Sequence, residues 1–300
     1  MLYDVTLAVR YAYDQPAGAA RMNLRMMPGS NPAQRLISGL LEADPVPDLR
    51  RDRLDFFGNA LSEIAYTAPL DAVAFRFTGR IQPLEVPRGL DLSCALSELP
   101  RELNELMSLA PDMPHHFLGV SDRVSPMPAI TGFARDLTRP DMPVLAAVEA
   151  LSAALHAEIA FDPTATDVTT DPAVAFENRR GVCQDISHIM IAALRGIGVP
   201  AGYVSGFLRT EPPEGEERLA GADAMHAWVR AWCGQEIGWI EIDPTNDMRV
   251  GADHIDVAMG RDYSDVAPVK GTLRTSGLHS TFHSVDMIPV DETAGRPQEG

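Results

Sequence analysis

The hydrophobic periodicity of this chain changes along its length, and that change limits the possible folds more than any other feature. Over roughly the first 90 residues apolar and polar side chains alternate, most regularly in residues 3–13 and 72–83. An alternation with a period of two is typical of half-buried β-strands. From Leu99 onward apolar residues recur at helical spacing, and Pro100 occupies an early helical position. The pattern therefore predicts an α+β protein that begins with a β-rich module.

The predicted elements divide the chain into four parts. Strands are expected in a set of short runs that comprises residues 3–13, 21–27, 35–42, 53–57, 60–67 and 72–83, with a turn at Phe57–Ala60. Helices are expected from residue 99 and over residues 143–160, and the proline-rich stretch between them, with its His115–His116 pair, is expected to be a solvated loop. We therefore expect a β-rich N-terminal domain (1–95), a helical connecting segment (96–140), a core domain (141–290) and a frayed tail (291–300).

The balance of charged and apolar residues excludes several classes of protein. The chain has 25 Lys and Arg against 42 Asp and Glu, a formal net charge of −17, and 45% of its 300 residues are hydrophobic. Such a chain can bury a sizeable core, so it is not intrinsically disordered. Its charge repels nucleic-acid phosphates and anionic lipids, so we expect neither nucleic acid nor a membrane as a partner. No stretch resembles a signal peptide or a membrane span, which predicts a cytoplasmic protein.

One of the three cysteines stands at a position that favours reactivity. Cys183 lies two residues after Gly181 and opens a run whose apolar residues fall on one helical face, and two glycines and a proline end that run. The first turn of a helix carries unpaired backbone N–H groups and the positive end of the helix dipole, and both favour a thiolate. Cys94 and Cys233 have no such setting, and we interpret them as structural. Three cysteines are too few for a disulfide framework.

Two downstream segments supply a possible base and a carboxylate for Cys183. Residues 224–232 alternate as a strand and carry His226, and residues 238–243 are predicted to form the neighbouring strand, which Asp243 ends before a proline. A hairpin between these strands would place Asp243 beside His226. The carboxylate would then orient the imidazole, and the imidazole would activate Cys183 for attack on an acyl carbon.

The three segments together resemble those of a known family. Gly181–Asp185 (GVCQD) at a helix start, His226–Trp228 (HAW) on one strand and Gly238–Asn246 (GWIEIDPTN) on the next are similar to the bacterial transglutaminase-like superfamily, a branch of the papain-like cysteine hydrolases. This similarity covers roughly residues 145–250. Three further segments resemble the N-terminal domain and the region after the core in the same bacterial group: Tyr11–Asp14 (YAYD), Asp55–Asn59 (DFFGN) and Arg261–Pro268 (RDYSDVAP).

The resemblance implies both a fold for the core and roles for its residues. The fold is a papain-like core in which the helix that bears the cysteine packs on an antiparallel sheet that bears the histidine and the acid. Cys183 would be the nucleophile, His226 the general base and acid, and Asp243 the orienting carboxylate. From the residues alone we assign the same three roles.

An oxyanion hole requires further donors beside the cysteine. The backbone N–H of Cys183 can supply one donor. Animal transglutaminases use a tryptophan upstream of the nucleophile for this purpose, but this chain has no tryptophan before Trp228. Gln184 and Tyr203 are therefore candidates for site support, and Trp228 is a candidate for a wall of the site.

Other polar residues near the cysteine have structural or metal-binding interpretations. Asp185 is expected to cap its own helix, and His188, which lies on another helical face, is expected to support the structure. A zinc site of Cys183, His188, His226 and Cys233 is an alternative. It lacks a CxxC pair, and a zinc-bound thiolate would not be a free nucleophile. We therefore expect no metal and no cofactor.

These observations predict a cysteine-dependent enzyme that acts on amide bonds through a thioester acyl-enzyme. It is a peptidase or amidase if water accepts the acyl group, and a transglutaminase-like acyltransferase if a primary amine does. Because bacterial relatives are mostly described as cysteine proteases, hydrolysis of a protein or peptide substrate is favoured. Calcium dependence is not indicated, because the chain has no EF-hand spacing. The alternative function is a non-catalytic binding or assembly module that retains the papain-like scaffold.

Overall fold

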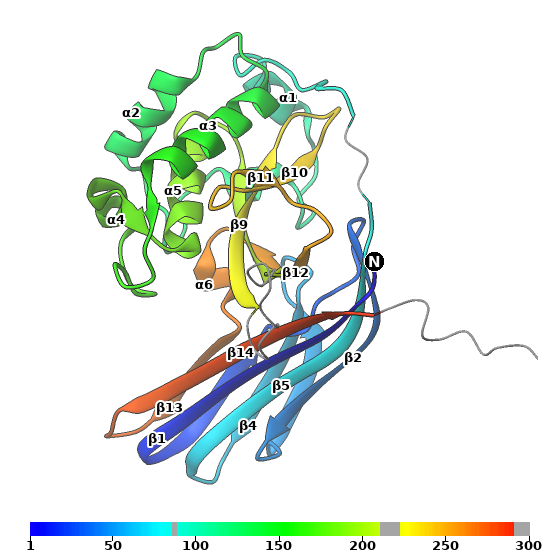
Figure 1. The fold of residues 1–300 in the computed structure, drawn as a ribbon, viewed down its shortest axis with the longest axis vertical. Helices are drawn as coiled ribbons and strands as arrows, with labels where there is room; N and C mark the ends of the chain where they lie inside the picture. The colour runs from blue at the N-terminus through cyan, green and yellow to red at the C-terminus, as the bar shows by residue number, and fades with distance from the viewer. Residues whose placement is uncertain (86–88, 211–222, 291–300) are drawn as a thin grey trace, which may run out of the picture.

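The computed structural model describes residues 1–85, 89–210 and 223–290. Most helices gather at one end of the molecule, a large β-structure forms the other end, and a five-stranded sheet lies between them (Figure 1). This arrangement confirms the predicted α+β fold with a β-rich N-terminal region. The tail predicted at 291–300 lies outside the described residues.

The N-terminal β-structure is organised around one long strand, β1 (Tyr3–Leu24). The first half of β1 pairs with β5 (Leu70–Pro83) on one side and with β14 (His279–Pro289) on the other, and β2 (Gln34–Asp44) pairs with β5. The second half pairs with β4 (Ala60–Tyr66) and β13 (Val269–Arg274), and β3 (Leu49–Leu54) pairs with β4. The strands predicted at 3–13 and 21–27 are thus one element, with an irregular register between Ala12 and Ala17.

The C-terminal strands β13 and β14 complete the N-terminal sheets. They lie within the range predicted for the core domain, 141–290, yet both pair with β1. Without them one edge of β1 would expose unpaired backbone groups along most of its length. A local hydrophobic pattern shows which face of a strand is buried, but it does not identify the neighbouring strand. Residues 269–289 therefore belong to the N-terminal sheets by their pairing.

The helices surround one buried helix, α5 (Cys183–Gly196), whose residues from Gln184 to Leu194 are all buried. The others are α1 (Leu99–Glu105), the 3-10 helix η1 (Pro114–Phe117), α2 (Pro128–Leu137), α3 (Val144–Glu158), α4 (Pro172–Asn178) and α6 (Tyr263–Val266). The helices predicted from Leu99 and over 143–160 are confirmed as α1 and α3. His115 is exposed and His116 partly exposed on η1. Among the described residues, no helix is both long and apolar enough to span a membrane.

The five-stranded sheet carries α5 on one side. Its strand order is β11 (Met248–Arg249), β10 (Trp239–Asp243), β9 (Ala224–Trp232), β8 (Ala201–Leu208) and β12 (His254–Gly260), and all neighbours are antiparallel. A short parallel pair, β6 (Ala160–Phe161) and β7 (Arg180–Gly181), leads into α5. Gly206 of β8 leaves room for the Trp228 ring, because a Cβ at this position would overlap that ring. The predicted helix on an antiparallel sheet is therefore present.

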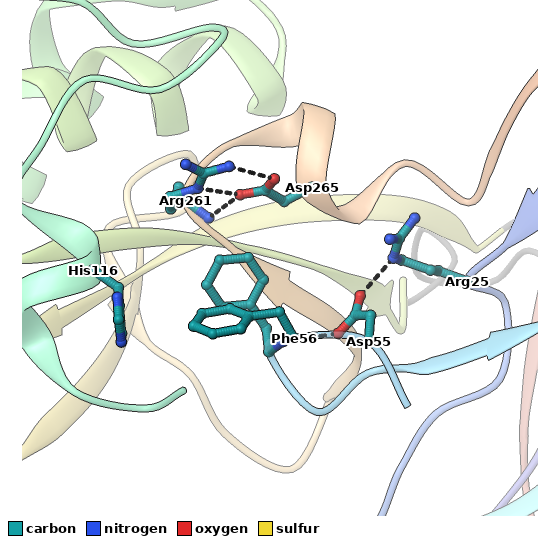
Figure 2. A pocket seen from close by; sticks show the side chains of 7 residues that line it. Arg25, Asp55, Phe56, His116, Arg261 and Asp265 are labelled. Atoms are coloured by element: carbon teal, nitrogen blue, oxygen red, sulfur yellow. Dashed lines mark hydrogen bonds and ion pairs between the residues drawn. The ribbon is translucent and has the colours of Figure 1, made fainter. Parts of the chain in front are cut away.

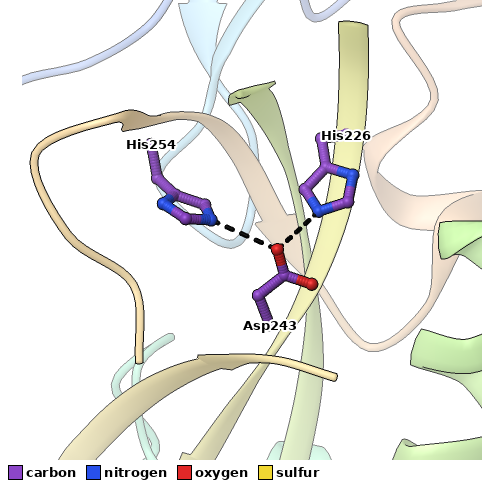
Figure 3. A group of neighbouring side chains, drawn as sticks. All are labelled: His226, Asp243 and His254. Carbon is purple, nitrogen blue, oxygen red and sulfur yellow. Dashed lines mark hydrogen bonds and ion pairs between the residues drawn. The ribbon is translucent and has the colours of Figure 1, made fainter. Parts of the chain in front are cut away.

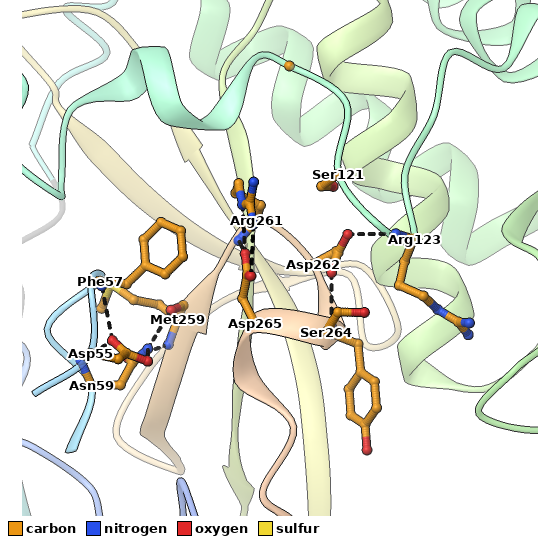
Figure 4. Close-up of polar contacts among 12 residues, drawn as sticks. Asp55, Phe57, Asn59, Ser121, Arg123, Met259, Arg261, Asp262, Ser264 and Asp265 are labelled. Atoms are coloured by element: carbon orange, nitrogen blue, oxygen red, sulfur yellow. Dashed lines mark hydrogen bonds and ion pairs between the residues drawn. The ribbon is translucent and has the colours of Figure 1, made fainter. Parts of the chain in front are cut away.

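A turn of the N-terminal module docks directly on this sheet (Figure 4). The turn predicted at Phe57–Ala60 is confirmed, with Gly58 at a φ of 85°. The Asn59 side-chain amide donates to the Met259 carbonyl, and its oxygen accepts from the Met259 N–H, both at 2.8 Å. Asp55 accepts from the backbone N–H of Asn59 at 3.0 Å and so fixes the docking residue.

The N-terminal module and the five-stranded sheet also share a hydrophobic core. Phe207 of β8 and Ile255 and Val257 of β12 belong to the same buried cluster as the side chains of β1 and β5. All three are at most 5% exposed. The module is therefore packed directly against the sheet that carries the candidate site.

Candidate active site

The start of α5 holds Cys183 in a fixed position. The Asp185 carboxylate accepts from the backbone N–H of Val182 at 2.8 Å and from the Thr166 hydroxyl at 2.6 Å. A Cβ on Gly181 would lie 2.8 Å from an oxygen of that carboxylate, so this position needs glycine. The predicted cap by Asp185 is confirmed. A carboxylate at this end also interacts favourably with the helix dipole.

The predicted base and carboxylate meet at the open end of the β9–β10 hairpin (Figure 3). The His226 Nε2 lies 2.7 Å from the Asp243 Oδ2, and both side chains are buried. The β9–β10 pairing runs up to Ile242 opposite Val229, which leaves Asp243 beside the His226 end of β9. The expected contact between the histidine and the acid is therefore present.

The pKa of His226 reflects its interactions with both Asp243 and Cys183. Burial alone lowers the pKa of an imidazole, but hydrogen bonds to Asp243 and Cys183, together with their negative charges, raise the pKa of His226 to about 9. In turn, hydrogen bonds from His226 and its neighbours overcome the effect of burial and hold the pKa of Asp243 well below its usual value. The structure thus brings Cys183, His226 and Asp243 together in the order that the sequence predicts.

The Asp243 carboxylate is fully buried, and several donors hold it. Its Oδ1 accepts from the backbone N–H groups of Thr245 at 2.9 Å and Asn246 at 3.3 Å. Its Oδ2 accepts from the Asn246 side-chain amide at 2.7 Å as well as from His226. The sharp turn after the proline therefore wraps these donors around the acid and keeps it ionised.

A second histidine, which the sequence analysis missed, contacts the same carboxylate oxygen. The His254 Nε2 lies 3.3 Å from the Asp243 Oδ2, and the His254 side chain is fully buried (Figure 3). His254 begins β12, at the opposite edge of the sheet from β10. No local pattern in the sequence signals this contact, because it depends on how the sheet curls.

His226, Asp243 and His254 are also the group in the described part of the chain that could hold a metal ion, with ligand atoms within 4.8 Å of one another. The zinc alternative was a different set, and His188 and Cys233 do not belong to this group. Both imidazoles direct Nε2 toward one carboxylate oxygen, so these nitrogens carry protons and a metal would have to displace them. The chemistry of the cluster fits a hydrogen-bonded network better than a metal centre.

The three predicted supporting residues differ in what they contact. The Gln184 side-chain amide donates to the Val168 carbonyl at 3.3 Å. Trp228 is fully buried and donates its indole N–H to Glu241 at 2.7 Å. Tyr203 is fully buried, and burial, followed by the charge of Cys183, raises its pKa well above the usual value. Of the three, Tyr203 is the side chain that interacts electrostatically with the candidate nucleophile.

His188 supports this region from behind. Its ring packs on Tyr203 with centroids 5.0 Å apart, and its Nε2 accepts from the backbone N–H of Tyr263 at 3.2 Å. Burial lowers the pKa of His188 to about 4, so the ring is neutral and can accept this bond. The expected supporting role of His188 is confirmed by these contacts.

A second polar layer lies beneath the histidines. Burial and the neighbouring Glu241 raise the pKa of Asp256 well above its usual value, so the Asp256 carboxyl group favours its protonated form. The Arg230 guanidinium is buried over the Trp239 ring, 4.0 Å from its centroid, and the negative charge of this carboxyl pair faces it. The layer is therefore close to neutral, which reduces the cost of burying its charges.

The other two cysteines have environments that suppress ionisation. Burial, assisted by the charge of Glu102, raises the pKa of Cys94 to about 11. Burial raises the pKa of Cys233 still further, and its side chain is fully covered. Both residues fit the structural interpretation, because a thiol that stays protonated is a poor nucleophile.

A cavity of about 440 Å³ lies at the junction between the N-terminal module and the core (Figure 2). Its wall contains two ion pairs, Arg25 with Asp55 at 2.7 Å and Arg261 with Asp265 at 2.8 Å, beside the Phe56 ring. None of the predicted catalytic residues lines it. The segments DFFGN and RDYSDVAP, which the sequence analysis singled out, meet at this cavity.

The sequence and fold match known proteins over nearly the whole chain. Residues 131–244 match the transglutaminase-like superfamily, and residues 3–82 match the bacterial transglutaminase-like N-terminal region. An uncharacterized protein of Mycobacterium tuberculosis, Rv2569c, is 30% identical over 97% of this chain and 94% of its own length. A second, ML0607 of Mycobacterium leprae, is 31% identical over 87% and 89%.

A solved structure shares the fold. It is a protein from Cytophaga hutchinsonii named "Putative Cysteine Protease", with a TM-score of 0.66 and 17% sequence identity. The similarity covers 97% of this chain and 92% of that one. It therefore extends over both the N-terminal β-structure and the core.

Proposed function

Because the chain belongs to the transglutaminase-like superfamily, we propose that it is a cysteine-dependent enzyme that cleaves or transfers the acyl group of an amide bond. The observation that carries the proposal is the buried contact between His226 and Asp243 beside Cys183 at the start of α5. This arrangement is that of an activated nucleophile, a base and an orienting acid.

The proposed reaction has two steps, formation of a thioester on Cys183 and transfer of its acyl group to an acceptor. The Cys183 thiolate attacks the amide carbonyl, and His226 donates a proton to the departing amine, which leaves a thioester. His226 then takes a proton from the acceptor as it attacks the thioester, and Cys183 is released. Asp243 keeps the imidazole oriented and stabilises its charged form throughout.

The oxyanion that forms during attack requires hydrogen-bond donors. The backbone N–H of Cys183 belongs to the first turn of α5, where N–H groups have no partner within the helix. Tyr203 is proposed as the second donor, because its phenol is un-ionised and interacts with Cys183. The Gln184 amide is already bonded to Val168, so it is less suited to this role.

The proposed substrate is a protein or peptide with an accessible amide carbonyl, and the proposed acceptor is water. The name of the Cytophaga hutchinsonii protein agrees with hydrolysis, although the likeness to it supports the fold alone. A primary amine as acceptor would follow the same path through the thioester. The net charge of −17 disfavours nucleic acid and anionic membranes as partners.

The test is alkylation of the three cysteines by iodoacetamide between pH 5 and 10, followed by mass spectrometry. It needs no substrate, and Cys94 and Cys233 serve as internal controls in each sample. We expect Cys183 to react at least tenfold faster than either at pH 6, and to lose this advantage in His226→Ala, because the imidazolium stabilises the thiolate.

Two results would count against the proposal. Equal reactivity of the three cysteines at pH 6 in the wild type would show that no activated thiolate is present. An unchanged Cys183 rate in His226→Ala would show that His226 does not activate it. Either result would favour a binding or assembly module that retains the scaffold without its chemistry.

A further inference from the structure

The proposed reaction leaves one buried titratable residue of the site without a role, and that residue is His254. Its side chain is fully buried, at the start of β12, and its Nε2 points to the carboxylate of Asp243. In the sheet, β12 and β10 are separated by β9 and β8. The contact between His254 and Asp243 therefore joins the two sides of a strongly curled sheet at the active site.

The hydrogen bonds to one oxygen of Asp243 determine which ring nitrogen of His226 and of His254 carries a proton. The Asp243 Oδ2 faces His226 Nε2 at 2.7 Å, His254 Nε2 at 3.3 Å and the Asn246 amide at 2.7 Å. A carboxylate is an acceptor only, so each imidazole must carry a proton on Nε2. The Nδ1 of His226 is then the nitrogen available to Cys183.

Packing against neighbouring side chains does not by itself explain why residue 254 is a histidine. The His254 ring packs edge-on against the Trp228 ring, with centroids 5.2 Å apart at 84°. A phenyl ring would make the same contact. The His254 Nδ1 is buried and has no hydrogen-bond partner among the described residues, and an unpaired buried polar atom is unfavourable. The Nε2–H that faces Asp243 is therefore the feature that a phenyl ring would not provide.

We propose that His254 is a positioning residue for the proposed reaction. By donating its Nε2–H to Asp243, it prevents the carboxylate from turning away from His226 and so keeps the His226 Nδ1 directed at Cys183. This inference rests on the proposed function and assigns a fourth side chain to the same site. His254 itself contacts neither the nucleophile nor a substrate.

The charged groups around this cluster come from three strands. His226 lies on β9, Asp243 and Glu241 on β10, and Asp256 on β12 with His254. The Glu241–Asp256 pair bonds to Trp228 and Asn31. Of these groups, Asp243 and His226 are the ones whose interaction would change directly when His254 is replaced.

Two variants separate positioning from packing. His254→Phe keeps the ring contact with Trp228 and removes the donor, whereas His254→Gln keeps an N–H donor near the position of Nε2. The measurement is the Cys183 alkylation rate from pH 5 to 10 in each variant, with Cys94 and Cys233 as internal controls. Thermal unfolding of each variant is recorded in parallel.

We expect the curve of Cys183 alkylation rate against pH to move about one pH unit upward in His254→Phe. A carboxylate that can turn stabilises the His226 imidazolium less well. One unit corresponds to about a tenfold slower alkylation at pH values below the midpoint of the curve. The curve of His254→Gln should remain within about twofold of the wild type. A role in packing alone would lower the melting temperature without moving either curve.

The results distinguish this inference from the proposed function. If the wild type has no reactive Cys183, the proposed function fails and this inference fails with it. If the wild-type curve shows the activated thiolate and His254→Phe reproduces it, or both variants shift equally, only the role of His254 is overturned.

A measurement on the unmodified protein keeps the inference testable if a variant does not fold. Nitrogen-15 NMR of histidine-labelled protein reports which ring nitrogen carries the proton. The inference requires the Nε2–H tautomer for neutral His254, and an Nδ1–H tautomer would overturn it.

Discussion

At the scale of single residues, burial and hydrogen bonding have opposite effects on the pKa of His226. Burial disfavours the charged ring, yet hydrogen bonds to Asp243 and Cys183 raise its pKa to about 9. The stabilisation from the charged ring is therefore complete below the unfolded pKa near 6.5, and it is lost as the pH rises through about 9. The pKa of Asp243 is lowered, so its contribution is present above the usual range of a carboxyl group and is lost as the pH falls below it.

The substitution Asp243→Asn tests this balance. We expect it to lower the free energy of unfolding by about 2 kcal/mol near pH 6, because a hydrogen bond between charged groups is replaced by a neutral one. The difference from the wild type should shrink above pH 9 and below pH 4. Urea unfolding at a series of pH values measures it. A difference that is constant across this range would contradict the assignment of the charged pair.

The His226 ring itself gives a second readout of the same substitution. NMR titration should find its pKa near 9 in the wild type and at least one unit lower in Asp243→Asn, since the carboxylate that contributes most to raising it is then replaced by a neutral amide. His188, whose pKa is lowered to about 4 by burial, serves as the control ring and should keep that pKa in both proteins. An unchanged His226 titration would show that Asp243 does not stabilise the imidazolium.

At the scale of elements, the start of α5 combines a structural cap with the candidate nucleophile. Gly181 allows the Asp185 side chain to fold back on the chain, and Asp185 then holds Val182 and Thr166. The cap and Cys183 lie within the same helical turn. Loosening the cap should therefore affect both the stability of the helix and the position of the thiol.

The substitution Asp185→Ala tests this coupling. It should lower the free energy of unfolding by about 1–2 kcal/mol through loss of the cap and slow the alkylation of Cys183 at pH 6. Asp171→Ala is the matched control, because Asp171 caps the neighbouring helix α4 by accepting from Ala173. This control should cost similar stability but leave the Cys183 rate unchanged. A loss of reactivity in both variants would indicate a general effect of destabilisation.

At the scale of the whole molecule, the two ends of the chain form one β-structure, and the candidate site is built against it. Strands β13 and β14 pair with β1, and Phe207 and Ile255 of the central sheet are buried among the same side chains. Asn59 adds two hydrogen bonds from the N-terminal module to the backbone of Met259. The N-terminal module therefore packs against the sheet that carries the candidate site.

The substitution Asn59→Ala tests whether this docking is structural. Removing the amide leaves the N–H and carbonyl of Met259 unpaired in a largely buried interface, so we expect a loss of about 2 kcal/mol in the free energy of unfolding. Arg53→Ala, which breaks the exposed pair with Glu63, is the control and should leave the free energy of unfolding nearly unchanged. Equal effects of the two substitutions in urea unfolding would contradict the docking role of Asn59.

The sequence alone determined the features that depend on near neighbours in the chain. The alternation in β1 and β5, the helical face that follows Cys183 and the end of the strand at Asp243 are each set by residues a few positions apart. The cap at Asp185 belongs to the same class, since donor and acceptor lie within one turn. Local patterning encodes these features because it fixes backbone conformation and the face that is buried.

Only the tertiary structure decided which buried faces meet. The contact of His254 with Asp243 and the interaction of Glu241 with Asp256 connect β12 to β10, which are not neighbours in the central sheet, and β13 and β14 pair with β1. A hydrophobic pattern is the same whichever partner covers it, so it cannot specify these contacts. They follow from the curl of the sheet and the closure of β1 on both edges, which exist only in the folded chain.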